Sequence, residues 1–209
     1  CQKYGIDYLK VENVNSKKFI AEITEYECDL LISMSFNQIF KGDIINLTKF
    51  GIINCHAGKL PFYRGRNILN WALINGEDEF GITVHYVDSG IDTGDIIMQE
   101  TYPISLSDDY LTLLEKSYVE CAKILYKAIC LFKGGTVVGI KQTEFHSTGF
   151  YCSKRKIGDE VLDWHLSSKD LFNFVRGLCL PGPMSRTYID GQEVKINKVE
   201  LVNGAVLYK

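Results

Sequence analysis

Hydrophobic and polar positions along the 209-residue chain follow two alternating patterns. Short apolar runs that end in small or polar residues predict buried strands, and apolar positions spaced by three or four residues predict amphipathic helices. Strands that take turns with helices predict an α/β fold with an open, mostly parallel, Rossmann-like sheet flanked by helices. The strand pattern covers residues 29–35, 51–56, 81–87 and 96–100, and the helix pattern covers residues 18–26, 66–75 and 108–132.

The longest helical pattern, over residues 108–132, predicts one long amphipathic helix. Ser107 and Asp108 fit its N-terminal cap, because short side-chain oxygens accept hydrogen bonds from the first free backbone N–H groups. Gly134 and Gly135 predict its end. The expected buried side carries Leu111, Leu114, Tyr118, Cys121, Leu125 and Ile129.

The pattern changes near residue 145, where we expect a boundary between two units. Residues 146–209 form a small predicted C-terminal α+β extension, with one helix over residues 167–178. Its last part predicts a β-hairpin, because Asp-Gly at 190–191 separates two runs rich in β-branched and aromatic residues. This apolar hairpin could support a homodimer.

Charge and cysteine content narrow the classes of partner. A net charge of -3 gives no electrostatic footprint for nucleic acid, so we expect no nucleic-acid partner. The basic cluster Lys154-Arg155-Lys156 is interpreted as a short exposed loop. Seven cysteines without metal-ligand spacing are typical of reduced thiols in a cytoplasmic protein, and no apolar run is long enough to span a membrane.

Polar side chains with catalytic potential stand at the ends of two predicted strands. Asn54 and His56 end the strand over residues 51–56, and Asp92 follows the strand over residues 81–87. Residues two apart on a strand share a face, and open α/β sheets bind ligands beyond the carboxyl ends of their strands. We therefore expect these three side chains to converge.

Each of the three residue types suits one role in the acylation of an amine. The Asn54 amide, aided by His56, can stabilise the oxyanion that forms when an amine attacks a carbonyl carbon, and such a donor is worth about 3 kcal/mol. His56 can take the proton of the amine near neutral pH, while Asp92 can orient the imidazole and raise its pKa. Such acyl transfer needs no nucleophilic Ser or Cys.

Simpler interpretations of these residues stay open. A single His at a strand end can be a hydrogen-bonded structural residue, and Asn54 and Asp92 can be turn formers. His56, His85 and Asp92 could instead ligate zinc, but no HExxH or paired-cysteine spacing supports a metal site, so we expect no metal.

The segment over residues 58–67 is rich in aromatic, cationic and glycine residues and precedes a predicted helix. Backbone N–H groups and the helix dipole favour an anion at such a helix N-terminus. Arg can hold phosphate bidentately, and Tyr or Phe can stack on a ring. An ordinary polar loop with a helix cap fits the same composition.

Over roughly residues 28–190 the chain resembles the formyltransferase family that uses 10-formyltetrahydrofolate. Five motifs in order carry the resemblance: Asn54-x-His56, Leu60-Pro61, Tyr63-Arg64-Gly65, Gly81-x-Thr83 and Asp92-Thr93-Gly94-Asp95. The resemblance implies an N-formyltransferase whose catalytic core covers residues 1–145, with 10-formyltetrahydrofolate as its cosubstrate. It also implies that the extension over residues 146–209 contributes to the substrate site.

The resemblance assigns roles to particular residues. The catalytic Asn, His and Asp of the family correspond to Asn54, His56 and Asp92. The folate is expected against the loop after the strand over residues 29–35 and against the segment that leads to Asp92. The residues expected to bind it are Ser35, Phe36, Asn37, Ile39, Val87, Asp88, Gly90 and Asp95.

The sequence of residues 56–67 is most similar to that of the sugar N-formyltransferases of this family. These enzymes formylate the amino group of a nucleotide-linked amino-deoxy sugar, often dTDP-linked, for surface polysaccharide such as the O-antigen of lipopolysaccharide. We therefore expect a nucleotide sugar as the acceptor. The residues expected to bind it are Lys59, Phe62, Tyr63, Arg64, Gly65, Arg66, Trp71 and Arg176.

Three alternatives remain. Methionyl-tRNA formyltransferase has a similar core but usually carries a longer C-terminal β-barrel and must bind RNA. A formyltetrahydrofolate hydrolase uses a similar Asn, His and Asp. An inactive binding module is the third alternative, because family members begin with a strand, a glycine-containing loop and a helix that we expect to be missing here.

Overall fold

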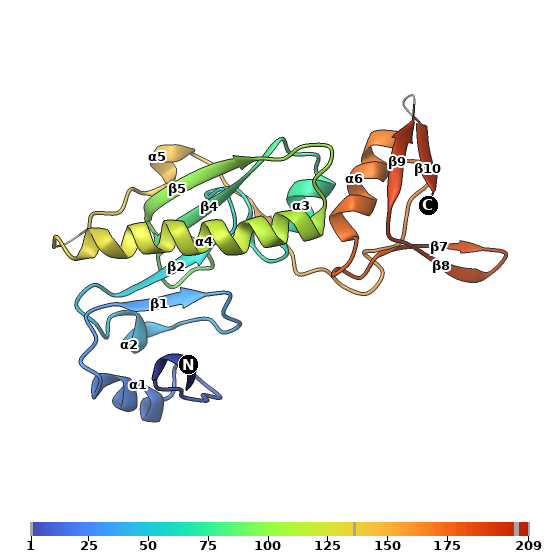
Figure 1. Cartoon of the computed structure of the whole chain (residues 1–209). Coiled ribbons are helices and arrows are strands. Elements are labelled where there is room, and N and C mark those ends of the chain that lie inside the picture. The colour runs from blue at the N-terminus through green and yellow to red at the C-terminus, as the bar shows by residue number, and fades with distance from the viewer. Residues whose placement is uncertain (1, 136, 203–204, 209) are drawn as a thin grey trace.

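A four-stranded sheet in the order β1-β2-β4-β5 forms the centre of the larger unit (Figure 1). The computed structural model describes residues 2–135, 137–202 and 205–208. β1 and β2 are parallel, whereas β4 is antiparallel to both β2 and β5. The strands are β1 Leu31–Met34, β2 Ile52–His56, β4 Glu79–Tyr86 and β5 Ile96–Pro103.

The predicted α/β class, with helices against an open sheet, is confirmed. Parallel pairing within this four-stranded sheet is limited to β1 and β2. β4 and β5 form a hairpin because the connection over residues 87–95 is short, and strands joined by a short loop pair in antiparallel fashion. The loop that carries Asp92 is therefore a hairpin loop that folds back toward the carboxyl end of β2.

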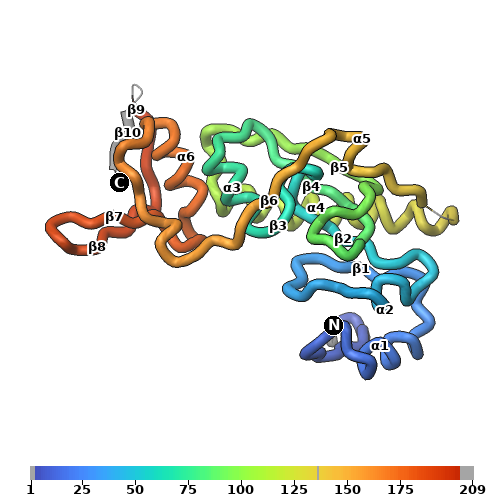
Figure 2. Tube along the Cα trace, turned by 180° about the vertical axis from the view of Figure 1, so that it is seen from behind, coloured from blue at the N-terminus to red at the C-terminus, as the bar shows by residue number. Residues whose placement is uncertain are grey.

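Helices cover the sheet unevenly. α4 runs along one side of β2, β4 and β5, and the chain that follows α4 passes along the other side (Figure 2). α1 and α2 lie beside β1, next to the N-terminus (Figure 1). The helices are α1 Lys17–Thr24, α2 Gly42–Ile45, α3 Ile68–Ile74, α4 Tyr110–Phe132, α5 Gln142–Phe145 and α6 Ser168–Leu178, with a 3-10 turn over Gln2–Tyr4.

The main core lies between β2, β4, α3 and α4. Ile53, Ile82 and Val84 from the strands pack with Leu73 of α3 and Ile124 of α4, and all five are fully buried. Burial of an aliphatic side chain of this size contributes about 1.5–3 kcal/mol. This core therefore anchors the carboxyl end of β2, where Asn54 and His56 lie.

α4 begins later and faces the core differently than predicted. Its N-cap is Asp109, which forms a capping box with Thr112, rather than Ser107 or Asp108. Leu111 and Tyr118 of the predicted buried side are 42% and 59% exposed. Small residues let the helix approach the sheet closely, so the buried stripe follows Leu113, Ser117, Cys121, Ile124, Ala128 and Phe132.

The C-terminal unit packs α6 against α3 and carries two hairpins. The Asn70 side chain donates a hydrogen bond of 2.7 Å to the carbonyl of Gly177, which joins the two units. The hairpin predicted over residues 187–196 is confirmed, and a second hairpin follows it. The strands are β7 Ser185–Ile189, β8 Gln192–Ile196, β9 Val199–Val202 and β10 Ala205–Tyr208, and the short strands β3 Arg64–Gly65 and β6 Tyr151–Cys152 pair with each other nearer the sheet.

Two further features bear on the sequence-based expectations. Among the helices of the described ranges, none combines the length and the apolar character that crossing a membrane requires. The cysteines that can be assessed, from Cys28 to Cys179, are all free thiols.

Candidate active site

Asn54, His56 and Asp92 converge at the carboxyl end of β2. The Nδ1 atom of His56 lies 3.7 Å from Oδ2 of Asp92, which also accepts a 2.9 Å hydrogen bond from the N–H of Gly65. Asn54 lies two residues before His56 on the same strand, so both side chains share one face. The convergence expected from the sequence therefore occurs, through the hairpin loop between β4 and β5.

His85 is a fourth member of this group that the sequence analysis considered only as a zinc ligand. It lies directly opposite Asn54 in the antiparallel β2–β4 pair. Its Nε2 atom lies 3.2 Å from Nδ2 of Asn54 and 3.6 Å from Oδ1 of Asp92, and the side chain is buried. The missing signal was the pairing register, which brings His85 next to Asn54.

Backbone carbonyls fix the tautomers of both imidazoles. A carbonyl oxygen only accepts, so Nδ1 of His85 donates to Tyr86 and Nε2 of His56 donates to Tyr63, each at 2.7 Å. In the neutral rings, Nε2 of His85 can then accept from the Asn54 amide, and Nδ1 of His56 keeps a free lone pair.

In the part of the chain that the structure describes, no cluster of three or more His, Cys, Asp or Glu side chains could hold a metal ion.

Burial and neighbouring charges set the protonation of the pair. Burial lowers the pKa of His56, and the nearby Asp92 carboxylate only partly opposes this effect. Burial alone would raise the pKa of Asp92, but His85, His56 and the Gly65 N–H together lower it to about 2. At neutral pH the site therefore holds an unprotonated imidazole beside a carboxylate.

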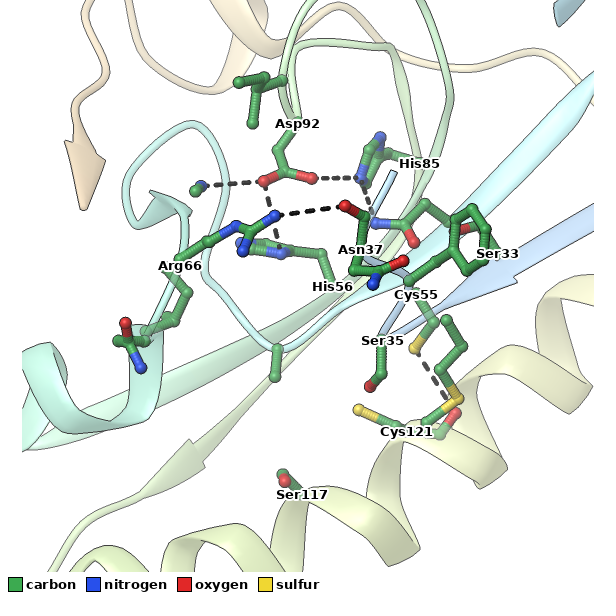
Figure 3. Close-up of a pocket in the computed structure, with 18 of the residues that line it drawn as sticks. Ser33, Ser35, Asn37, Cys55, His56, Arg66, His85, Asp92, Ser117 and Cys121 are labelled. Carbon is green, nitrogen blue, oxygen red and sulfur yellow. Dashed lines mark hydrogen bonds and ion pairs between the residues drawn. The ribbon is translucent and has the colours of Figure 1, made fainter. Parts of the chain in front are cut away.

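These side chains open into a cavity of about 590 Å³, here called the large cavity (Figure 3). Asp92 lies between His56 and His85 at one side, and Ser117 and Cys121 of α4 lie at the other. Several lining residues adopt the left-handed region that L side chains rarely occupy, a kind of strain that clusters at functional sites. They are Ser35, Asn67 and Asp92, with φ values from 51° to 57°.

Most residues expected to bind folate line the large cavity. They come from the loop after β1 and from the loop after β4, so two distant segments meet at one wall. Asp95 does not lie there, because it is already past the turn and its carbonyl pairs with the N–H of Tyr86. The expected residues that line the wall are Ser35, Phe36, Asn37, Ile39, Val87, Asp88 and Gly90.

Only Gly65 and Arg66 of the eight residues expected to bind the acceptor line the large cavity. Arg66 is exposed, and its guanidinium reaches the carbonyl of Asn37 at 3.5 Å (Figure 3). Lys154, which was interpreted as part of an exposed loop, also lines this cavity. Arg66 and Lys154 therefore place two cations at its edge.

Lys59, Phe62 and Tyr63 lie on the other side of their loop. They line a second hollow of about 360 Å³, the small cavity, together with residues 77–81 and Phe150. Two of its three carboxylates are paired: Glu79 contacts Lys59, and Glu77 accepts from the Tyr63 hydroxyl. The loop has two faces, and composition alone could not assign these residues to the correct one.

Arg64, Trp71 and Arg176 hold parts of the fold together. The Trp71 indole N–H donates to the carbonyl of Ser153 at 3.1 Å, and Arg64 donates to Gln142. Arg176 is buried on α6, and its guanidinium donates to the carbonyls of Ser105 and Asp108 and to the side chain of Asn173. None of these three lines the large cavity, and their role toward an acceptor stays a prediction.

Family models match most of the chain. Residues 3–129 match the model described as "Formyl transferase", and residues 155–207 match "Formyl transferase, C-terminal domain". Eight curated relatives of 30–35% identity are all methionyl-tRNA formyltransferases. The chain spans 60–64% of the length of these relatives.

Three matches illustrate the range. Methionyl-tRNA formyltransferase of Fusobacterium nucleatum is 35% identical over 190 residues, which are 91% of this chain and 60% of the relative. The structure of the Clostridium thermocellum methionyl-tRNA formyltransferase superposes with a TM-score of 0.73 at 17% identity, over 96% of this chain and 83% of that one, which shows the shared fold. WlaRD, a sugar 3N-formyl transferase solved in the presence of dTDP and 5-N-formyl-THF, gives a TM-score of 0.59 at 28% identity, over 83% and 61% of the two chains.

These relatives overturn the expected nucleotide-sugar acceptor. The sugar enzymes are matched among solved structures, whereas the curated relatives over most of the chain act on methionyl-tRNA by name. The similarity of residues 56–67 to the sugar enzymes does not outweigh these matches, and a chain that spans under two thirds of its relatives gives no support from the length of its C-terminal part. The matching models show that the chain belongs to the formyltransferase family.

Proposed function

We propose that this protein transfers a formyl group from 10-formyltetrahydrofolate to the amino group of methionyl-tRNA. The observation that carries the proposal is the convergence of Asn54, His56 and Asp92 at a cavity in a chain whose curated relatives are methionyl-tRNA formyltransferases. Such a substrate implies a cytoplasmic protein. The reaction needs no metal.

The formyl donor is proposed to bind the wall formed by the loops after β1 and β4. The wall combines apolar side chains such as Phe36, Ile39 and Val87 with the polar groups of Asn37 and Asp88. Cofactor sites of this kind pair an apolar lining with a few fixed polar groups. WlaRD, which is 28% identical, was solved in the presence of 5-N-formyl-THF, and this supports a folate as the donor.

Asn54 is proposed to stabilise the developing oxyanion. One amide N–H of Asn54 points to Nε2 of His85, 3.2 Å away, which holds the amide plane in place. The second N–H stays available for the formyl oxygen. A preorganised donor of this kind contributes about 3 kcal/mol to the transition state, because it needs no reorganisation during the reaction.

His56 is proposed to take the proton that the attacking amine loses. Its Nε2–H is held by the Tyr63 carbonyl, so the proton is accepted at Nδ1, where Asp92 lies 3.7 Å away and stabilises the imidazolium. The new bond joins the amine nitrogen to the formyl carbon. The bond between that carbon and N10 of the folate then breaks, and the proton passes from His56 to N10.

The 3′ end of the tRNA is proposed to enter beside Arg66 and Lys154. Both cations line the edge of the large cavity, and the segment that carries Lys154 is held against α3. There, the Asn67 side chain accepts from the backbone N–H of Arg155, and Trp71 donates to the carbonyl of Ser153. Cations held in place near the catalytic groups can pair with phosphates even in a chain of negative net charge.

The test is formylation of methionyl-tRNA by the protein with 10-formyltetrahydrofolate, followed by mass analysis of the released aminoacyl group. The proposal expects N-formylmethionine. Deacylated tRNA is the matched control and should gain no formyl group. Release of formate without an acceptor would favour a hydrolase. Absence of formyl transfer to methionyl-tRNA would contradict the proposal.

A further inference from the structure

The segment over residues 137–142 lies along the outside of the β4–β5 hairpin. It lies between the two family matches, which end at residue 129 and begin again at residue 155. The Tyr86 hydroxyl donates to the carbonyl of Val137, and Ile140 exchanges two 2.8 Å backbone hydrogen bonds with Ile96. This connecting segment is therefore fixed to the hairpin whose loop carries Asp92.

Gln142 ends the connecting segment and uses its whole side-chain amide. Its Nε2 atom donates to the carbonyls of Asp92 and Gly94, each at 2.9 Å. Its Oε1 atom accepts from Nε and Nη2 of Arg64, at 3.0 and 2.6 Å. The side chain is only 4% exposed, so these are buried and fully satisfied contacts.

These contacts form a closed ring around Asp92. The residue after Arg64 is Gly65, whose N–H donates to the Asp92 carboxylate at 2.9 Å. Gln142 thus holds the main-chain carbonyl of Asp92, and Gly65 holds its carboxylate. Arg64, which precedes Gly65, in turn donates to Gln142. Asp92 has φ 53°, a strained conformation that persists only where surrounding contacts impose it.

We propose that Gln142 is a positioning residue that holds the Asp92 loop, residues 88–94, so that the carboxylate faces His56 and His85. Only a side-chain amide can donate to two carbonyls and accept from a guanidinium at the same time. Glu would keep the contact with Arg64 but lose both donors, and Met would fill a similar volume without either function. The effect on the Asp92 carboxylate is independent of the substrate, whereas the effect on rate rests on the proposed function.

The experiment compares the full-length chain with Gln142→Met and Gln142→Glu, using Gln192→Met on the exposed β7–β8 hairpin as the control. Carboxyl 13C NMR follows the titration of Asp92, which His56, His85 and the Gly65 N–H face. In Gln142→Met the Asp92 midpoint should rise toward the ordinary value of 3.8. Gln192→Met should leave it unchanged.

Formyl transfer to methionyl-tRNA is the second readout. Both Gln142 variants should lower kcat roughly ten- to hundredfold, because small displacements of a catalytic group cost this much, while KM changes less than about twofold. An Asp92 midpoint in Gln142→Met equal to that of the wild type would overturn the inference. If Gln142→Met does not fold, the kcat of Gln142→Glu is the deciding measurement. A wild-type kcat in Gln142→Glu would then overturn the inference.

The two proposals fail in different ways. Absence of formyl transfer by the wild-type chain would contradict the proposed function and leave the NMR comparison as the test of Gln142. A lower kcat in Gln142→Met with an unchanged Asp92 midpoint would show a loss of rate that does not pass through Asp92, and would also overturn the inference.

Discussion

The large and the small cavity lie on opposite sides of the loop over residues 57–67, and their charged groups behave differently. In the small cavity Lys59 and Glu79 satisfy each other. In the large cavity Nδ1 of His56 and one N–H of Asn54 have no hydrogen-bond partner among the described residues, which leaves them open to the proposed substrate. A charged or polar residue in such a loop indicates chemistry only if its bonding capacity is not already used inside the protein.

Replacing His56 should have the largest effect, because it removes the group assigned as the base. His56→Ala should lower kcat for methionyl-tRNA by about 10²–10⁴-fold, the usual contribution of general base catalysis, and should leave the fold intact. Steady-state kinetics and circular dichroism check both parts. The matched control is His165→Ala, an exposed histidine of the C-terminal unit, and turnover in His56→Ala close to that of this control would remove His56 from the mechanism.

Gly58 tests whether the geometry of His56 matters. A Cβ at Gly58 would overlap the His56 ring and the Tyr63 carbonyl that holds it. Gly58→Ala should therefore lower kcat by about 10²-fold, because the imidazole must move. Gly134→Ala, where a Cβ would meet only ordinary contacts, is the control, and equal activities of the two variants would contradict the assigned geometry.

Arg66 and Lys59 compare the two cavities directly. Arg66→Ala should raise KM for methionyl-tRNA about tenfold, since a cation–phosphate contact is worth roughly 1–2 kcal/mol. Lys59→Ala should change it less than about twofold, because its ammonium is paired with Glu79 outside the large cavity. Initial rates over a range of tRNA concentrations at fixed ionic strength separate the two, and a larger effect for Lys59→Ala would reverse the assignment of the cavities.

The pH dependence of kcat follows from the lowered pKa of His56. The unprotonated ring is the proposed base, so the rate should stay constant near neutral pH and fall only as the pH drops below the ordinary value of about 6.5. Because Asp92 raises the pKa of His56, Asp92→Asn should move this decline to still lower pH. A decline that begins above pH 7 in the wild-type protein would contradict the described environment of the ring.

The smallest predicted effect concerns the free energy of unfolding and the Asp92 carboxylate. Its pKa is about 2 in the folded protein against 3.8 in the reference state, so its carboxylate contributes about 2 kcal/mol above pH 3.8. This contribution is lost as the pH falls from 3.8 through 2. Urea unfolding of Asp92→Asn at pH 7 should show a loss of this size, and an equal stability of both proteins at pH 7 would count against the paired carboxylate.

The sequence predicted the parts of the site that depend on strand position. Asn54 and His56 share a face because they lie two apart on β2, and Asp92 follows the next strand of the sheet. His85 was not assigned to this group, because its place beside Asn54 depends on an antiparallel register that only the folded sheet defines. The predicted buried face of α4 was also wrong, because small residues such as Ser117 and Ala128 face the core, where bulky residues were expected.

Residues distant in sequence were beyond such reasoning. Gln142 lies 50 positions from Asp92, and its role depends on the path of the connecting segment. Arg64 was expected at the acceptor because Arg can hold phosphate, and Arg176 through the family resemblance, yet both donate to groups of the protein itself. Local composition shows what a side chain can bind, and only the tertiary structure shows what it does bind.

The most direct test of the difference between the two cavities is a crystal structure of the protein with 5-formyltetrahydrofolate, a stable relative of the donor. The account predicts the folate in the large cavity, against Phe36 and Val87, with its formyl-bearing end toward Asn54 and His56. Folate bound in the small cavity beside Tyr63 and Glu77, or a formyl group turned away from His56, would contradict it.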